Sequence, residues 1–171
     1  NESVPCQVPL RYKPDGSAVA GKHSLGTNYG GNGGTELDAS NGSALGTFAV
    51  STNPRGIAFD GAHIWVANNL SNSVTELDAS NGSVLGTFSV GSNPRGIAFD
   101  SKHIWVANYV SNTVTELDAS NGSILGKFSV GNNPQGIAFD GKHSWVANYG
   151  GNSVTELDAS TGSTRGNFSV G

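Results

Sequence analysis

Residues 91–130 read GSNPRGIAFD SKHIWVANYV SNTVTELDAS NGSILGKFSV, and most of this string recurs along the chain at intervals of 40 residues. The hexapeptide Thr-Glu-Leu-Asp-Ala-Ser begins at positions 35, 75, 115 and 155. A fixed period of this length indicates a repeat architecture, in which each repeat is one small structural unit. We therefore divide the chain into an N-terminal extension, residues 1–10, and a domain, residues 11–171, whose repeats are 11–50, 51–90, 91–130 and 131–170.

Each repeat has the pattern of four short strands separated by turns. In the third repeat we expect strands at 96–100, 103–108, 114–118 and 124–130, because these stretches are rich in β-branched and aromatic residues. Asn121-Gly122 is a hairpin-turn signal, as is the Asp-Gly pair that the second and fourth repeats carry where the third has Asp100-Ser101. Glycine or asparagine interrupts every window before a helical period can develop, so no helix is expected.

Residues 104–107, Ile-Trp-Val-Ala, are apolar at four successive positions. Successive side chains of a strand point to opposite faces, so both faces of this strand must be covered. A four-stranded sheet that its neighbours cover on both faces is the blade of a β-propeller. The sequence therefore predicts an all-β fold, a β-propeller built from four 40-residue, four-stranded blades.

The first repeat has diverged from the others. The second and third repeats agree at 31 of 40 positions, whereas the first and second agree at only 21. Apolar residues of the second repeat are replaced by smaller ones in the first: Ser17, Val19, Leu25, Gly26 and Gly34 stand where the second has Ile57, Phe59, Trp65, Val66 and Val74. Terminal repeats are commonly atypical because they lack a neighbour on one side. We expect this repeat to be an end unit or a seam.

Composition and charge argue against nucleic acid as a partner and against a membrane-spanning helix. Only 13% of the residues are charged, about half the usual fraction of a globular domain, and the net charge is −4. The basic residues are scattered, which argues against nucleic acid because phosphate binding needs a dense basic face. No apolar run is long enough to span a membrane as a helix. The chain starts at Asn1 without methionine, consistent with a secretion signal already removed.

The repeat resembles that of YVTN-type β-propellers, a group related to NHL-like and virginiamycin B lyase-like propellers. The similarity is carried by residues 104–109, 112–118 and 128–138 and their equivalents, and it covers about 160 of the 171 residues. The resemblance implies a blade fold and a secreted or cell-surface protein. Such propellers have six to eight blades, whereas this chain encodes four. Three arrangements follow: a closed four-bladed ring, an eight-bladed ring or longer assembly made with a second copy, or a fragment of a longer protein. Residues 8–10 match the last strand of a repeat and are a candidate extra strand.

The resemblance also implies which loops share one face of the propeller, and thus a candidate ligand site. Convergent Arg, Asn and Tyr side chains there would suit a polar or anionic ligand. The alternative is that the asparagines only bond within their own turns and the arginines are solvated. The candidate residues are Arg55, Arg95, Gln135, Asn68, Asn108, Asn148, Tyr29, Tyr109 and Tyr149.

Two recurring patterns suggest metal or acid–base chemistry, but each has a simpler interpretation. One histidine per repeat, at 23, 63, 103 and 143, would form a ring of metal ligands, yet no repeat supplies a recognised metal spacing. Each Glu-x-Asp pair, such as Glu116 and Asp118, would hold calcium or act as acid and base, but the aspartate also fits as a turn-capping residue. We therefore expect turn-bonded histidines and aspartates, with no catalytic residue, no metal and no cofactor.

Asparagine sequons and one cysteine complete the candidate sites. Glycosylation is possible in principle at Asn1 and at the sequons Asn41, Asn69, Asn81, Asn121 and Asn167, although the Asn-Gly-Ser turn alone explains three of them. Cys6 has no partner within the chain, so it is either a free thiol or a bond to another chain.

The sequence favours a secreted or cell-surface, non-catalytic binding or structural scaffold that self-assembles into an oligomer, surface layer or fibre. Weak like-charge repulsion supports contact between copies. The expected partners are further copies of this chain, or another extracellular protein or glycan. The alternative function is that of a metal-dependent propeller enzyme of the lyase or lactonase kind.

Overall fold

A computed structural model describes residues 13–171, which form four sheets of four antiparallel strands each. The extension, with its candidate strand at 8–10 and Cys6, lies outside these residues. Blade 1 contains β1 (Lys13–Ala20), β2 (His23–Tyr29), β3 (Gly33–Asp38) and β4 (Ala44–Ala49). Blade 2 contains β5 (Pro54–Phe59), β6 (His63–Asn68), β7 (Ser73–Asp78) and β8 (Val84–Ser89). Blade 3 contains β9 (Pro94–Phe99), β10 (His103–Asn108), β11 (Thr113–Asp118) and β12 (Ile124–Ser129).

Blade 4 contains β13 (Pro134–Phe139), β14 (His143–Asn148), β15 (Ser153–Asp158) and β16 (Thr164–Ser169), with one short 3-10 turn, η1 (Tyr149–Gly151). Each sheet follows chain order, from an innermost to an outermost strand. The predicted all-β fold of four four-stranded, 40-residue blades is confirmed. No helix in the described part of the chain is long and apolar enough to cross a membrane.

Two turns in each repeat explain why the strands reverse where they do. Asp118 accepts hydrogen bonds from the backbone and hydroxyl of Ser120, and Gly122 returns the chain to β12 with a φ of +71°. The predicted turn-capping role of this aspartate is thus confirmed. The Asp100 turn is closed by its own backbone N–H, which donates to the carbonyl of His103, and Ser101 holds a φ of +82°.

Neighbouring blades share apolar cores that are built from equivalent positions of the repeat. Between blades 2 and 3, Trp65 and Val74 contact Ile104, Val106 and Leu117. The core between blades 3 and 4 uses the equivalent positions, except that the buried Ser144 stands where blade 3 has Ile104. One face of each central blade therefore presents tryptophan and valine, and the other presents isoleucine, valine and leucine. This two-sided burial is the physical reason why residues 104–107 are apolar throughout.

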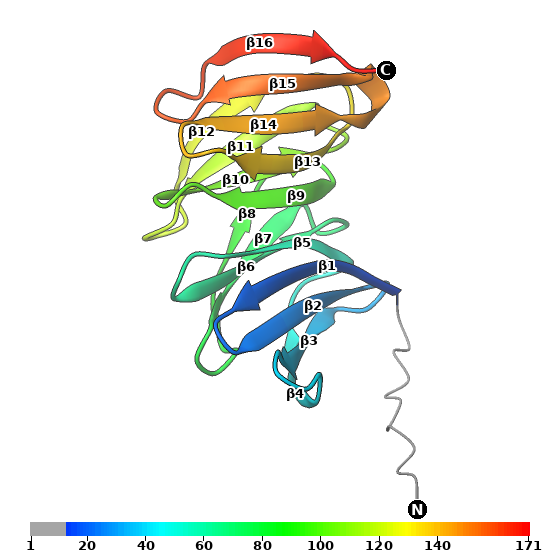
Figure 1. The fold of residues 1–171 in the computed structure, drawn as a ribbon, viewed down its shortest axis with the longest axis vertical. Coiled ribbons are helices and arrows are strands. Elements are labelled where there is room, and N and C mark those ends of the chain that lie inside the picture. The colour runs from blue at the N-terminus through cyan, green and yellow to red at the C-terminus, as the bar shows by residue number, and fades with distance from the viewer. Residues whose placement is uncertain (1–12) are drawn as a thin grey trace, which may run out of the picture.

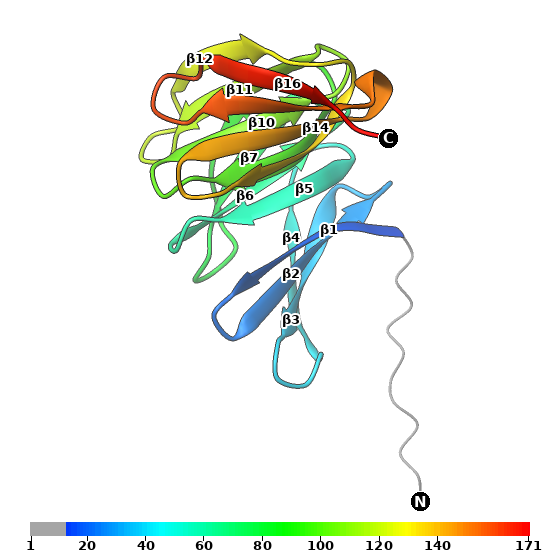
Figure 2. The same ribbon diagram turned by 45° about the horizontal axis from the view of Figure 1, so that its top comes forward.

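The four blades lie in a row, with β5 between β1 and β9, and β9 between β5 and β13. Figures 1 and 2 show blades 1 and 4 at opposite ends of this row, so the described residues form an open arc rather than a closed four-bladed ring. Within residues 13–171, no further blade covers the tryptophan face of blade 4. Trp145 is partly exposed, whereas Trp105, its equivalent in blade 3, is fully buried.

Candidate functional site

The innermost strands bring together the residue that follows proline in each repeat. Asp15, Arg55, Arg95 and Gln135 occupy this position in β1, β5, β9 and β13, and together they line a groove of about 200 Å³. Gly56 and Gly96 complete its wall, where innermost strands approach each other closely. Three of the predicted ligand residues, Arg55, Arg95 and Gln135, thus lie around one cavity.

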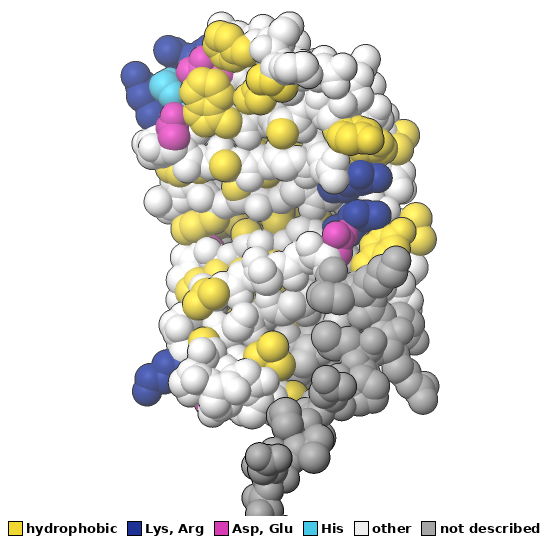
Figure 3. Space-filling model, turned by 45° about the vertical axis from the view of Figure 1, so that its right-hand side comes forward, with side chains coloured by type: hydrophobic (Ala, Val, Ile, Leu, Met, Phe, Trp, Pro, Cys, Tyr) yellow, Lys and Arg dark blue, Asp and Glu magenta, His cyan; other side chains and the backbone are white. Residues whose placement is uncertain are grey.

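Both arginines are held by tyrosine rings. The guanidinium carbon of Arg95 lies 3.5 Å from the centroid of the Tyr109 ring, and that of Arg55 lies 4.4 Å from the Tyr29 ring. Arg55 also forms an ion pair with Asp15, at 2.8 Å between Nη1 and Oδ2. Figure 3 shows basic side chains beside an acidic one and hydrophobic ones at the right-hand edge of the molecule. Stacking on a ring fixes the plane of a guanidinium and so prepares it for a planar, forked acceptor.

The groove is electrostatically positive around Arg95. Burial lowers the pKa of this guanidinium, and the neighbouring charge of Arg55 lowers it further. The Nε atoms of both arginines are buried and have no hydrogen-bond partner within residues 13–171. Binding a hydrogen-bond acceptor is favourable for such a group, because a buried donor without a partner costs free energy.

The predicted asparagines lie elsewhere. Asn108 is buried at the end of β10, and its amide donates to the hydroxyls of Thr113 and Thr115 within its own blade. Asn68 and Asn148 make the equivalent bonds. These three residues therefore hold β6, β10 and β14 to the next strand and do not line the arginine groove. Tyr149 is 70% exposed, and the structure stacks no arginine on it within the described chain.

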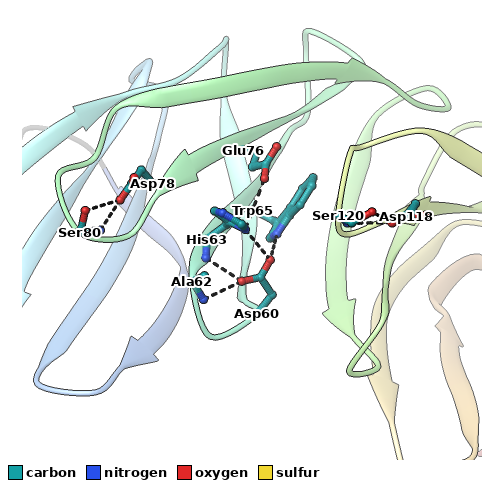
Figure 4. A network of polar contacts seen from close by, with 9 residues as sticks. All are labelled: Asp60, Ala62, His63, Trp65, Glu76, Asp78, Ser80, Asp118 and Ser120. Atoms are coloured by element: carbon teal, nitrogen blue, oxygen red, sulfur yellow. Dashed lines mark hydrogen bonds and ion pairs between the residues drawn. The ribbon is translucent and has the colours of Figure 1, made fainter.

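A second polar network recurs in blades 2, 3 and 4. In blade 2, Oδ2 of Asp60 accepts a hydrogen bond of 2.8 Å from Nε1 of Trp65, and its Oδ1 accepts from the backbone of Ala62 and His63 (Figure 4). Nδ1 of His63 lies 3.1 Å from Asp60 and 3.5 Å from Oε1 of Glu76. The histidine bonds within its own hairpin, as the simpler interpretation predicted.

The carboxylates of this network differ in pKa. Burial raises the pKa of Asp60, but the hydrogen bonds from Trp65 and the backbone outweigh it and hold the pKa below its usual value. Burial raises the pKa of Glu76, which accepts no such bonds, above its usual value. No group of three His, Cys, Asp or Glu side chains in the described part of the chain is arranged to hold a metal ion. The hydrogen bond from Trp65 to Asp60 acts as a clamp that orients Trp65 for the inter-blade core.

Sequence reasoning did not identify Asp15 or the Asp-Trp clamp, although a signal for the clamp was present. Blades 2 to 4 all carry Asp-x-x-His-x-Trp, whereas blade 1 has Ala20 and Leu25 in place of the aspartate and tryptophan. The joint loss of two residues that are five apart suggests that they contact each other.

The sequons fall into two structural groups. Asn41, Asn81, Asn121 and Asn167 are exposed, the first three in the equivalent turns of blades 1 to 3. Asn69 is buried, and its amide nitrogen, the atom that a glycan modifies, donates to the carbonyl of Pro94.

No model of a known protein family matches the chain, and no curated protein matches it. Among solved structures, a hydrazine synthase chain from Kuenenia stuttgartiensis superposes with a TM-score of 0.83 and 25% identity, covering 91% of this chain and 48% of that one. A streptogramin B lyase superposes with a TM-score of 0.79 and 15% identity, covering 92% of this chain and 55% of the other. The expected likeness to virginiamycin B lyase-like propellers is confirmed at the level of fold. The chain spans about half the length of these propellers.

Proposed function

We propose that this protein is a non-catalytic β-propeller scaffold that self-associates, with blade 4 of one copy docking on blade 1 of a second. Two such contacts would close an eight-bladed ring from two chains. The observation that carries the proposal is that the two end blades each expose one half of the contact that joins blade 2 to blade 3 and blade 3 to blade 4.

The internal contact has a recognisable centre, in which a phenylalanine of one blade covers a glycine of the next. The ring of Phe88 lies over Gly122, and that of Phe128 lies over Gly162, so closely that a Cβ atom on either glycine would collide with the ring. Each phenylalanine also stacks near its own blade's tryptophan, with ring centroids 5.8 Å apart between Phe128 and Trp105. The glycine is therefore needed for close approach as well as for its positive φ.

At the ends of the row, a phenylalanine and a glycine of this kind each lack a partner within the described chain. Phe168 of blade 4 is 48% exposed, because the described chain has no fifth blade to supply its glycine. Gly42 of blade 1 occupies the glycine position and has a φ of +74°, and no described residue apart from its chain neighbours lies within 4 Å of where its Cβ would be. A second copy would place Phe168 over Gly42 and cover both.

Blade 1 makes this contact weaker than the internal ones. Its facing surface has Ser17, Ser24 and Gly26 where blade 2 has the isoleucines and valine of the core. Burying the Phe168 side chain contributes about 2 kcal/mol, but these three positions add little apolar area. We therefore expect a reversible dimer rather than a permanent one. A contact between unlike surfaces closes into a ring only if its rotation allows, and otherwise produces a filament.

The composition of the chain also supports the proposal. Low charge gives little repulsion between copies, and the exposed Asn-Gly-Ser turns suit an extracellular or cell-surface location, which we include in the proposal.

Sedimentation equilibrium of the full chain at increasing concentration tests the assembly, with three variants. Phe168→Asp removes the apolar half of the contact, and Gly42→Asn fills the other half with a residue that tolerates a positive φ. Leu125→Ser is the matched control, because Leu125 is 51% exposed on β12, away from both end faces. We expect wild type and Leu125→Ser to reach twice the 17.5 kDa chain mass, and the other two variants to stay at the chain mass.

Two outcomes would contradict this function, and a third would change the form of the assembly. A wild-type protein that stays monomeric at about 1 mM would exclude self-association of useful strength. Dimers that survive both end-blade variants would place the interface elsewhere. An unlimited rise in mass would replace the closed ring with a filament.

A further inference from the structure

We infer that the groove between Arg55 and Arg95 is a binding site for a carboxylate group that carries a single negative charge. The groove is formed within one chain, so binding there does not depend on self-association. The same site would take a carboxylate from a sugar acid or from a peptide terminus, because both present the same pair of oxygens.

The groove holds donors that no residue of the described chain uses. Within residues 13–171, Arg95 forms no ion pair, although its guanidinium is partly buried and stacked on Tyr109. The other three innermost strands have a different group at this position. It is an arginine that forms an ion pair in β5, an aspartate in β1 and a neutral glutamine in β13. Arg95 is thus the one member of this set of four that offers a planar, forked pair of donors to an incoming group.

The surrounding charges select for a monoanion. Arg55 and Arg95 contribute two positive charges, and Asp15 removes one of them by pairing with Arg55 at 2.8 Å. A carboxylate leaves the groove neutral, whereas a doubly charged phosphate leaves an excess negative charge beside Asp15. Burial and the charge of Arg55 both lower the pKa of Arg95, and a bound anion would relieve that repulsion.

The size of the groove limits what enters it. Drug-sized ligands occupy cavities of roughly 300–1,000 Å³, and this groove measures about 200 Å³. It therefore accommodates one carboxylate and a few attached atoms, while the rest of the ligand lies outside. The exposed amide of Gln135 lies on the rim and is placed to bond a neighbouring hydroxyl or amide of that ligand.

Two-dimensional nitrogen–proton NMR, followed at the arginine Nε–H and Gly96 amide signals, tests this site directly. The probes are galacturonate and N-acetylglycine, with galactose and N-acetylglycinamide as neutral controls and inorganic phosphate as the dianion. We expect both carboxylates to give saturating shifts with a Kd on the order of 1–10 mM, as befits a small ligand on one strong contact. If only one of them saturates, it identifies the source of the carboxylate.

Arg95→Gln is the informative variant, because it places in blade 3 the residue that blade 4 carries at the same position. We expect it to fold and to bind the carboxylates at least about tenfold more weakly. Lys127→Gln removes an exposed charge from β12 and should leave binding unchanged. Equal shifts with the neutral probes, tighter binding of phosphate, or undiminished binding by Arg95→Gln would each overturn the inference.

Discussion

The loss in free energy of unfolding when a tryptophan is removed should depend on whether the next blade covers that tryptophan. Trp105 and Trp145 occupy equivalent positions, and each donates from Nε1 to an aspartate, at 2.8 and 2.7 Å. Trp105 is fully buried, whereas Trp145 is partly exposed and lies beside two rings of its own blade, Phe168 and His143, at 6.1 and 6.4 Å between ring centroids. The pair therefore differs mainly in the cover that the next blade supplies.

Substitution by alanine converts this difference into a measurable free energy. A buried tryptophan removes roughly 200 Å² from water, worth about 5 kcal/mol at 25 cal/mol per Å², and measured losses are about 3–5 kcal/mol. We expect Trp105→Ala to lower the free energy of unfolding by about 4 kcal/mol and Trp145→Ala by about 2 kcal/mol. Both variants lose an equivalent hydrogen bond, which is buried at Trp105 and exposed at Trp145, so the difference of about 2 kcal/mol reports the cover that the next blade gives to the ring and to this bond together.

Urea denaturation of both variants provides the measurement. At about 1 µM protein, where a weak dimer is dissociated, Trp105→Ala should lose about 2 kcal/mol more free energy of unfolding than Trp145→Ala. At about 100 µM the cost of Trp145→Ala should rise, because the second copy now covers this face. Equal costs at the lower concentration would refute the view that blade 4 has an uncovered apolar face.

Three further predictions follow from single positions. Ser101→Gly should stabilise the protein by about 0.5–1 kcal/mol in thermal or urea unfolding, because Ser101 has a φ of +82° that glycine adopts without strain; an unchanged stability would contradict this. Gly56→Ala should destabilise it by about 2 kcal/mol or more by the same assays, because its Cβ would collide with the carbonyl oxygen of Arg95, and a neutral result would mean that β5 and β9 are further apart. Asp100 has a pKa held below its usual value by hydrogen bonds that outweigh burial, so its contribution is present above about pH 4 and is lost as the pH falls below it. Asp100→Asn should therefore unfold with a weaker dependence on pH between about 2 and 4, and an unaltered acid profile would exclude this role.

The repeat made most of the fold predictable. The strand expected at 103–108 is β10, with the same bounds, and the expected strand at 96–100 is β9, which begins two residues earlier, at Pro94. Alternating side-chain directions and the short period determine these features locally, so neighbouring residues suffice to identify them.

The site was predictable only in part, because it depends on side-chain direction at strand ends. The pairing of β10 with β9 shifts register between Val106 and Asn108, and Asn108 bonds within the blade instead of facing a ligand. Such an irregularity is not visible in the composition of a strand. Arg95 was identified because its position after proline recurs, but its stacking on Tyr109 requires the structure.

The kind of substitution in blade 1, from large apolar residues to smaller ones, was more informative than the number of substitutions. The sequence predicted an end unit or seam from its small residues, and the structure places blade 1 at one end of an open row. The sequence alone could not reveal that Gly42 has open space where Gly122 and Gly162 each receive a phenylalanine ring of the preceding blade. That vacancy matters because it complements the exposed Phe168 at the other end.

The measurement that tests the central claim most directly is the mass of the chain in solution, before and after Gly42→Asn. The substitution lies in blade 1, leaves the apolar face of blade 4 untouched, and acts only through the proposed partner. We predict a concentration-dependent rise from 17.5 kDa to twice that mass for the wild type, and a constant 17.5 kDa for the variant. Identical masses for the two proteins at every concentration would contradict the account.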